Sequence, residues 1–105
     1  MGGLYACPTT GGCASPTLIV RARTLALIPN LVADEQGVFW TEEESATSID
    51  SKLLGCASAA CPGGPKTYAT GLTRVGNLRL DAKFFYFETD GATGGNSRAV
   101  KRLAR

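Results

Sequence analysis

The feature that most constrains the fold is the alternating stretch at positions 77–89, NLRLDAKFFYFET. Positions 78, 80 and 82 are apolar and lead into Phe84 and Tyr86, whereas positions 79, 81 and 83 are charged. A period of two residues predicts one β-strand over residues 77–89. At Phe85 and Phe87 the polar side becomes aromatic too, so both faces need cover there, from a second layer of this chain or from another subunit.

The composition agrees with a fold built from short strands and turns. A chain of 105 residues is long enough for one domain with a modest core, and we treat residues 1–105 as a single β-rich domain. The 13 Gly and 5 Pro favour turns. We therefore predict a mainly β protein, a small antiparallel β-sandwich or barrel with one or two short helices.

Other elements follow from local patterns. Strands are predicted over residues 17–28, where Pro29 and Asn30 should end the strand, over 37–44 and over 66–75. The first two of these should form a hairpin. A short helix within residues 45–55 should begin near Thr47 or Ser48 and end at Gly55. A second short helix is predicted in the basic C-terminal tail, residues 97–105, which must dock because nine residues cannot hold a helix alone.

The four cysteines are the strongest chemical signal. Cys7 and Cys13 lie in a Cys- and Gly-rich N-terminal segment, residues 1–16, while Cys56 and Cys61 lie in a Cys- and Gly-rich loop in the middle of the chain. Together they have the number of thiolates for a tetrahedral zinc site, although both spacings are wider than the usual one. Disulfides are the favoured alternative, with three pairings open and about 2–4 kcal/mol of stabilisation per bond. Free structural thiols are the third alternative.

The absence of histidine argues against an enzyme. Without it, neither a Cys/His nor a Ser/His/Asp arrangement can form. Lys66 and Thr67 resemble the end of a phosphate-binding loop, but Pro65 occupies the position of the final glycine and removes a backbone donor. We predict a non-enzymatic protein without a cofactor, zinc being the alternative.

The charge is unevenly distributed. Residues 1–55 hold three Lys or Arg against six Asp or Glu, and residues 56–105 hold eight against three. This polarity suits head-to-tail contact between copies, an acidic partner or nucleic acid, and a solvated tail is the simplest alternative. A sequence pI near 8.4 is low for a dedicated nucleic-acid binder, so this partner is not favoured. The cations of the tail are Arg98, Lys101, Arg102 and Arg105.

Apolar runs are too short to cross a bilayer, and we expect no membrane association. The first residues lack the pattern of a secretory signal, which predicts synthesis in the cytoplasm. Disulfides in such a protein make sense if its assembly leaves the cell, as a virus particle does on lysis.

These observations predict a structural or assembly subunit, such as a small decoration, neck or tail protein of a phage or virus particle. Its partners would be other copies of itself and other structural subunits. Phe85, Phe87 and Trp40 are the candidate interface residues, with ordinary core packing as the alternative. The second hypothesis for the function is a zinc-stabilised four-cysteine module that binds nucleic acid or a protein partner.

Overall fold

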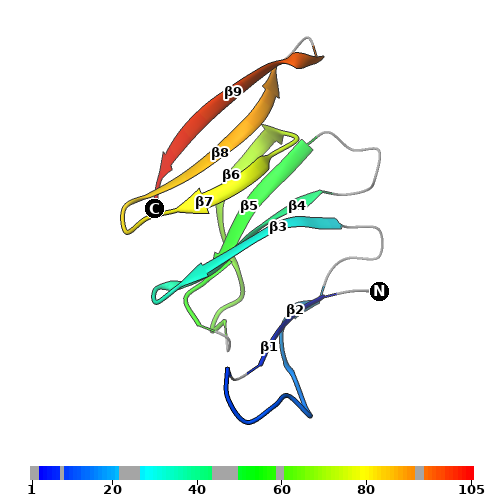
Figure 1. Ribbon diagram of the computed structural model, residues 1–105, viewed down its shortest axis with the longest axis vertical. Coiled ribbons are helices and arrows are strands. Elements are labelled where there is room, and N and C mark those ends of the chain that lie inside the picture. Colours follow the sequence, from blue (N-terminus) through cyan, green and yellow to red (C-terminus); the bar gives the residue numbers. More distant parts are fainter. Residues whose placement is uncertain (1–2, 8, 22–26, 44–49, 59–60, 92–93) are drawn as a thin grey trace.

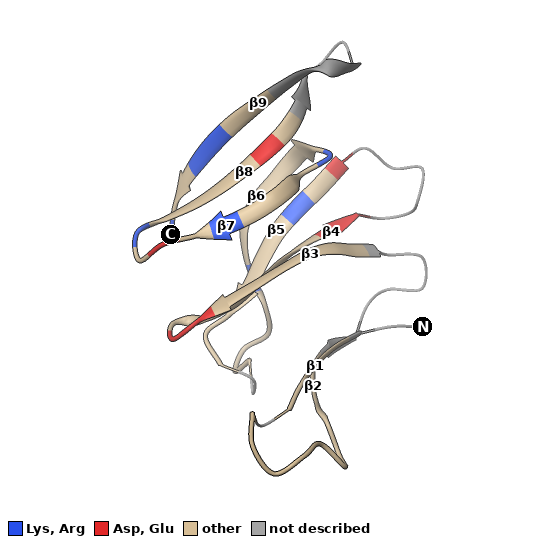
Figure 2. Cartoon of the chain, viewed as in Figure 1, with Lys and Arg blue, Asp and Glu red and all other residues tan. Residues whose placement is uncertain are grey.

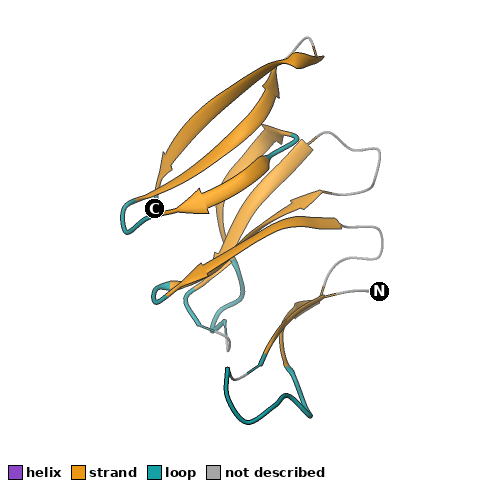
Figure 3. Ribbon diagram, viewed as in Figure 1, coloured by secondary structure: helices purple, strands orange, loops and turns teal. Residues whose placement is uncertain are grey.

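The computed structural model describes residues 3–7, 9–21, 27–43, 50–58, 61–91 and 94–105. These residues form nine strands and no helix (Figure 3). The mainly β class predicted from the sequence is therefore confirmed. The strands are β1 (Gly3–Ala6), β2 (Thr17–Arg21), β3 (Leu27–Asp34), β4 (Gly37–Glu43), β5 (Asp50–Cys56), β6 (Lys66–Thr73), β7 (Gly76–Leu80), β8 (Phe84–Gly91) and β9 (Gly94–Ala104).

The strands form three antiparallel sheets in which each strand pairs with its neighbour in the sequence. The orders are β1-β2, β3-β4-β5-β6 and β7-β8-β9. Figure 1 shows the four-stranded sheet in the middle, with the three-stranded sheet on one side and the β1–β2 hairpin on the other. The four-stranded sheet is therefore the central layer.

One hydrophobic cluster joins the central sheet to the three-stranded sheet. Phe39 on β4 and Leu53 on β5 pack with Phe85 and Phe87 on β8, and all four are buried. The rings of Phe39, Tyr68 and Phe85 meet edge to face, with centroids 5.1–5.8 Å apart. This geometry is favourable for aromatic rings because the positive edge of one meets the negative face of another.

Gly55 leaves room for this aromatic cluster. A Cβ atom at position 55 would overlap the ring of Phe39 and would lie 3.1 Å from the ring of Tyr68. Gly55 lies inside β5 and does not end a helix, contrary to the sequence prediction. The residue is glycine because two aromatic side chains from neighbouring strands occupy the space above it.

A second hydrophobic cluster lies on the opposite face of the central sheet. Side chains alternate along a strand, so Trp40 points away from the face that carries Phe39. Trp40, Cys56 and Cys61 pack there with Leu4 from the β1–β2 hairpin. The hairpin thus forms a third layer over the central sheet.

The predicted single strand over residues 77–89 is wrong, because the chain turns in its middle. β7 ends at Leu80, and β8 begins at Phe84 and pairs antiparallel with β7. The carboxylate of Asp81 accepts hydrogen bonds from the backbone N–H groups of Lys83 and Phe84, each 2.8 Å long. Asp favours such turns because its side chain can bond the backbone two residues on.

Both predicted helices are also wrong. The described part of the first, from Asp50 onward, is β5, and residues 44–49 lie outside the described residues. The second falls in β9, which pairs with β8 along most of its length. Strand partners on the neighbouring elements outweigh weak local helix signals of this kind.

The predicted strand over residues 17–28 corresponds to parts of two strands, and residues 22–26 lie outside the described residues. Pro29 and Asn30 do not end a strand but lie within β3, where the register shifts between Leu27 and Asn30. Proline is tolerated there because β3 is an edge strand of its sheet. The predicted strand over residues 37–44 corresponds to β4, and β4 pairs with β3. Only Leu27 and Ile28 of the predicted strand over residues 17–28 lie in β3, so the predicted hairpin is correct in its second strand only.

Candidate functional site

The candidate site is a groove between the β1–β2 hairpin and the central sheet. β1 and β2 are four and five residues long, whereas β3 and β4 beneath them have eight and seven. A short hairpin cannot cover the whole apolar face of longer strands. The part that it leaves open is the groove.

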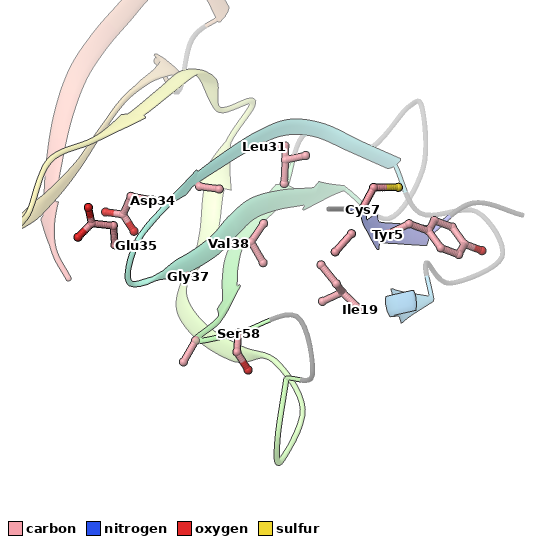
Figure 4. A pocket seen from close by; sticks show the side chains of 12 residues that line it. Tyr5, Cys7, Ile19, Leu31, Asp34, Glu35, Gly37, Val38 and Ser58 are labelled. Atoms are coloured by element: carbon pink, nitrogen blue, oxygen red, sulfur yellow. The ribbon is translucent and has the colours of Figure 1, made fainter. Parts of the chain in front are cut away.

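The groove has a volume of about 580 Å³ and a largely apolar lining. Figure 4 shows Ile19 of β2 facing Val38 of β4, with Tyr5 towards one end and the turn residues Asp34 and Glu35 at the other. The volume lies in the range of sites that hold a ligand or several side chains of a partner. The complete lining is Tyr5, Ala6, Cys7, Ile19, Leu31, Ala33, Asp34, Glu35, Gly37, Val38, Ala57 and Ser58.

Large apolar side chains are exposed at and beside the groove. Leu31 is 55% exposed and Tyr5 is 53% exposed, and both line it. Leu18, which is 39% exposed, is the strand partner of Tyr5 but does not itself line the groove. Clustered exposed apolar groups indicate a contact surface more than scattered ones do. None of these residues was predicted from the sequence as a site residue, and Leu31 directly follows Pro29 and Asn30, where the predicted strand should have ended.

The β3–β4 turn forms the acidic end of the groove. It is a two-residue hairpin turn, Glu35-Gln36, in which the backbone N–H of Gln36 donates a 2.9 Å hydrogen bond to Asp34 Oδ1. Gly37 closes the turn with φ at +151°, and a Cβ there would overlap the carbonyl oxygen of Cys56. The turn is therefore held against the end of β5.

Arg105 fixes this turn from the other side. Its guanidinium donates hydrogen bonds of 2.7 and 3.1 Å to the two carboxylate oxygens of Asp34, and a further one to the carbonyl oxygen of Asp81. The hydrogen bond from Arg105 is the main reason that the pKa of Asp34 lies below its ordinary value. Asp34 therefore stays a carboxylate at neutral pH.

In the predicted basic tail, the backbone pairs with β8 as far as Ala104, the side chains of residues 99–102 are exposed, and Arg105 is packed into the fold. The side chain of Arg105 is only 6% exposed, and its guanidinium lies 4.7 Å from the ring centroid of Phe39 and 5.5 Å from that of Phe85. Arg102 lies over Phe84, 4.3 Å from the ring centroid, and Lys101 is exposed on β9. The side chain of Arg98 lies outside the described part. Arg105 is thus part of the packing between the sheets.

The four cysteines form two local disulfides. Cys7 bonds Cys13, with Cα atoms 5.5 Å apart, and Cys56 bonds Cys61, with Cα atoms 5.0 Å apart. The disulfide prediction is confirmed, and the pairing is the local one of the three. Both bonds border the groove, because Cys7 lines it and Ala57 and Ser58 follow Cys56. The four-cysteine zinc site stays a prediction that would require all four thiols to be reduced.

The three candidate interface residues lie in the interior. Phe85 and Trp40 are fully buried and Phe87 nearly so. Phe85 and Phe87 face the central sheet, so a second layer of the same chain covers them. In this conformation they are core residues and not contact residues, which corrects the interface interpretation.

Two of the groups that line the groove, Cys7 and Asp34, are already bonded within the fold. In the described ranges, no group of three or more His, Cys, Asp or Glu is placed to hold a metal ion. Cys7 is bonded and the carboxylate of Asp34 is held by Arg105, so neither is set up as a nucleophile or a proton donor at neutral pH. The described residues also contain no helix, and hence no apolar helix of bilayer-spanning length.

Comparison with known proteins adds no relative from which a role can be carried over. No protein-family model, no curated protein sequence and no solved structure matches the chain.

Proposed function

We propose that the protein is a non-enzymatic assembly subunit that docks another structural protein in the groove between the β1–β2 hairpin and the central sheet. The four-stranded and three-stranded sheets would be the two layers of a β-sandwich that presents this surface. The single observation that carries the proposal is the gathering of the exposed apolar residues Tyr5 and Leu31 in one groove.

The energetic argument concerns apolar area that the fold itself leaves open. Fully burying a leucine side chain that would otherwise be fully exposed is worth about 1.5–3 kcal/mol, and about half of the Leu31 side chain is available for such burial. Exposed apolar groups at the centre of a surface, with polar groups at its end, have the usual composition of a protein contact site. Here Leu31 supplies an exposed apolar group between the two ends of the groove, Tyr5 lies towards one end, and Glu35 lies at the polar end.

The disulfides fit a subunit of an assembly that leaves the cell. Each closes a short loop next to the groove and would restrain its walls. Disulfides persist in oxidising surroundings and are rare in the cytosol. A phage or virus particle, with this chain as a decoration, neck or tail protein, is the assembly that we favour.

Site-specific photo-crosslinking in the producing cells tests the docking surface, because it captures a partner whose identity is not specified beforehand. A benzophenone amino acid in place of Leu31 should give a covalent protein adduct on irradiation, visible as a shifted band on a reducing gel. The same amino acid at Thr70, an exposed position on β6 that does not line the groove, is the matched control. Equal adduct yields at the two positions would show that the groove is not a docking surface.

A further inference from the structure

We infer that the partner in the groove is a second copy of this chain, which inserts the outer face of β9 around Val100. The inference rests on the proposed function and names its partner. Of the large apolar side chains that are exposed in the described residues, Tyr5 and Leu31 line the groove, Leu18 is the strand partner of Tyr5, and Val100 lies on β9. The chain therefore carries both an apolar groove and an apolar projection.

Val100 is the most exposed of these side chains, at 78%. Its partner on β8 is Glu88, which lies between the buried residues Phe87 and Thr89. Since paired residues of an antiparallel sheet point to the same face, Val100 points away from the central sheet. It stands on the outer surface of the molecule, where the structure places no other described strand over it.

Arg102 stands on the same outer face as Val100. It is two residues further along β9, and it lies over the ring of Phe84. Two residues along a strand span about 6.6–6.8 Å. The outer face of β9 thus presents an apolar side chain and, one step along the same row, a cation.

The groove presents the complementary pattern. Leu31, Ile19 and Val38 give it apolar walls, and Glu35 lies at its acidic end beside Asp34. Val100 of a second copy would pack between the apolar walls, and Arg102 of that copy would reach the acidic end. Figure 2 shows the red β3–β4 turn and the blue segment of β9 in separate parts of the molecule. Complementary charge of this kind selects partner and orientation.

Pairing of two β9 strands with each other is the less favourable arrangement. β9 is the edge strand of its sheet, but an antiparallel β9–β9 pair around residues 100–103 would bring Lys101 and Arg102 of both copies together. Like charges across strands are destabilising, and lysine on an edge strand opposes edge-to-edge pairing. The positive strand is better matched by the acidic end of the groove.

The two surfaces belong to opposite outer layers of the molecule. The groove lies on the hairpin side of the central sheet, and Val100 lies on the far side of the three-stranded sheet. A contact between them uses different patches on each copy, so it is heterologous. Repetition of such a contact gives a ring or an open filament.

A mixing experiment with purified, disulfide-intact protein tests this contact. Leu31→Asp places a charge in the apolar wall of the groove, and Val100→Asp places one on the outer face of β9. Each variant alone should associate at least about tenfold more weakly than the wild type. A mixture of the two should form a one-to-one dimer that does not grow, because one intact groove meets one intact β9. Sedimentation velocity, with nuclease-treated samples, measures the species.

Three controls make the result specific. Thr70→Asp, on exposed β6, should associate like the wild type. Arg102→Glu should weaken association, and combining it with Glu35→Lys in the other copy should restore it. Far-ultraviolet circular dichroism and thermal unfolding identify any variant that fails to fold. If Leu31→Asp or Val100→Asp fails to fold, Arg102→Glu and Glu35→Lys are used in the mixing experiment instead.

The inference is overturned if the wild type stays monomeric at millimolar concentration, if the mixture forms no dimer, or if association disappears once nucleic acid is removed. A groove adduct with a different protein in the crosslinking experiment would, in that case, leave the proposed docking function in place. Absence of any groove adduct, together with a monomeric wild type, would remove both.

Discussion

The two faces of the central sheet are covered in different ways. On one face, β7, β8 and β9 bring Phe85 and Phe87 onto Phe39 and Leu53, and this interior is sealed by Arg105. On the other face, a hairpin of two short strands covers Trp40 and leaves Leu31 largely exposed. The first face is closed by packing, whereas the second is half covered and bordered by two disulfides.

The closed face of the central sheet stabilises the fold, whereas the partly covered face has apolar side chains available for binding. A buried aromatic cluster makes many contacts, and each residue in it is costly to remove. An exposed leucine makes few, and its substitution should change the free energy of unfolding by less than about 0.5 kcal/mol. Substitutions on the closed face should therefore lower the free energy of unfolding, whereas substitutions at the groove should weaken binding and leave the free energy of unfolding almost unchanged.

The largest effect is expected on the closed face. Phe85→Ala should lower the free energy of unfolding by about 3–5 kcal/mol, because it leaves a cavity beside Phe39 and Tyr68. Urea denaturation followed by circular dichroism measures the loss. Phe84→Ala, the neighbouring residue on the outer face, is the control and should cost less. Equal losses would mean that β8 does not divide its side chains between core and surface as described.

Adding a methyl group to the packed cluster on the closed face should lower the free energy of unfolding somewhat less than removing a phenylalanine ring from it. Gly55→Ala places a methyl group against the rings of Phe39 and Tyr68, and should destabilise the protein by about 1–3 kcal/mol. Thermal or urea unfolding gives the value. In a Phe39→Leu background the cost of the alanine should fall, because the overlapping ring is gone. An unchanged cost in that background would place the strain elsewhere.

Loss of each of the two disulfides should have a different effect on the two faces of the central sheet. Replacing Cys56 and Cys61 by alanine should cost about 2 kcal/mol globally, because the bond restrains the unfolded chain and Cys56 is buried in the second cluster. Replacing Cys7 and Cys13 should mainly loosen the hairpin, since both residues are exposed. Amide hydrogen exchange should then rise in β1 and β2 with little change in β8. Equal acceleration in β8 would show that the hairpin supports the closed face as well.

The smallest expected effect is on acid stability. Arg105 lowers the pKa of Asp34 below its ordinary value of 3.8, so the charged carboxylate stabilises the folded protein above about pH 4. That contribution is lost as the pH falls through the lower folded-state value. Asp34→Asn keeps the turn but should reduce the difference between the urea midpoints at pH 6 and pH 3.

Some acid dependence should remain in the Asp34→Asn protein. The hydroxyl of Tyr86 donates a 2.7 Å hydrogen bond to Asp81 and is the main reason that the pKa of this second aspartate is lowered. An unchanged midpoint difference in Asp34→Asn would mean that the Arg105 pair does not hold the β3–β4 turn in solution.

In residues 77–89, alternation in the sequence predicted extended backbone but not where each strand ends. In residues 84–87 the pattern placed two aromatic residues on each side of a strand, and Phe85 and Phe87 are buried while Phe84 and Tyr86 face outward. The turn at Asp81 was missed because Asp81 and Ala82 also fit the alternation. The deciding interaction, a carboxylate bonded to two backbone N–H groups, is a matter of three-dimensional geometry.

The groove could not have been predicted from local patterns. It exists because the hairpin is shorter than the strands below it, and because Leu31 in β3 lies beyond its cover. Likewise, the cations at the end of the chain suggested a tail, but Arg105 is drawn into the packing by Asp34, which lies 71 residues earlier. Both features depend on contacts between distant segments.

The order of the strands also has a consequence for how the protein folds. Because every pairing joins strands that follow each other in the sequence, each sheet can form by successive closure of neighbouring hairpins. Such local steps take about microseconds, whereas contacts between distant segments carry the entropy of closing a long loop. Docking of the two meanders, completed where Arg105 meets Asp34, is the step that we expect to set the folding rate.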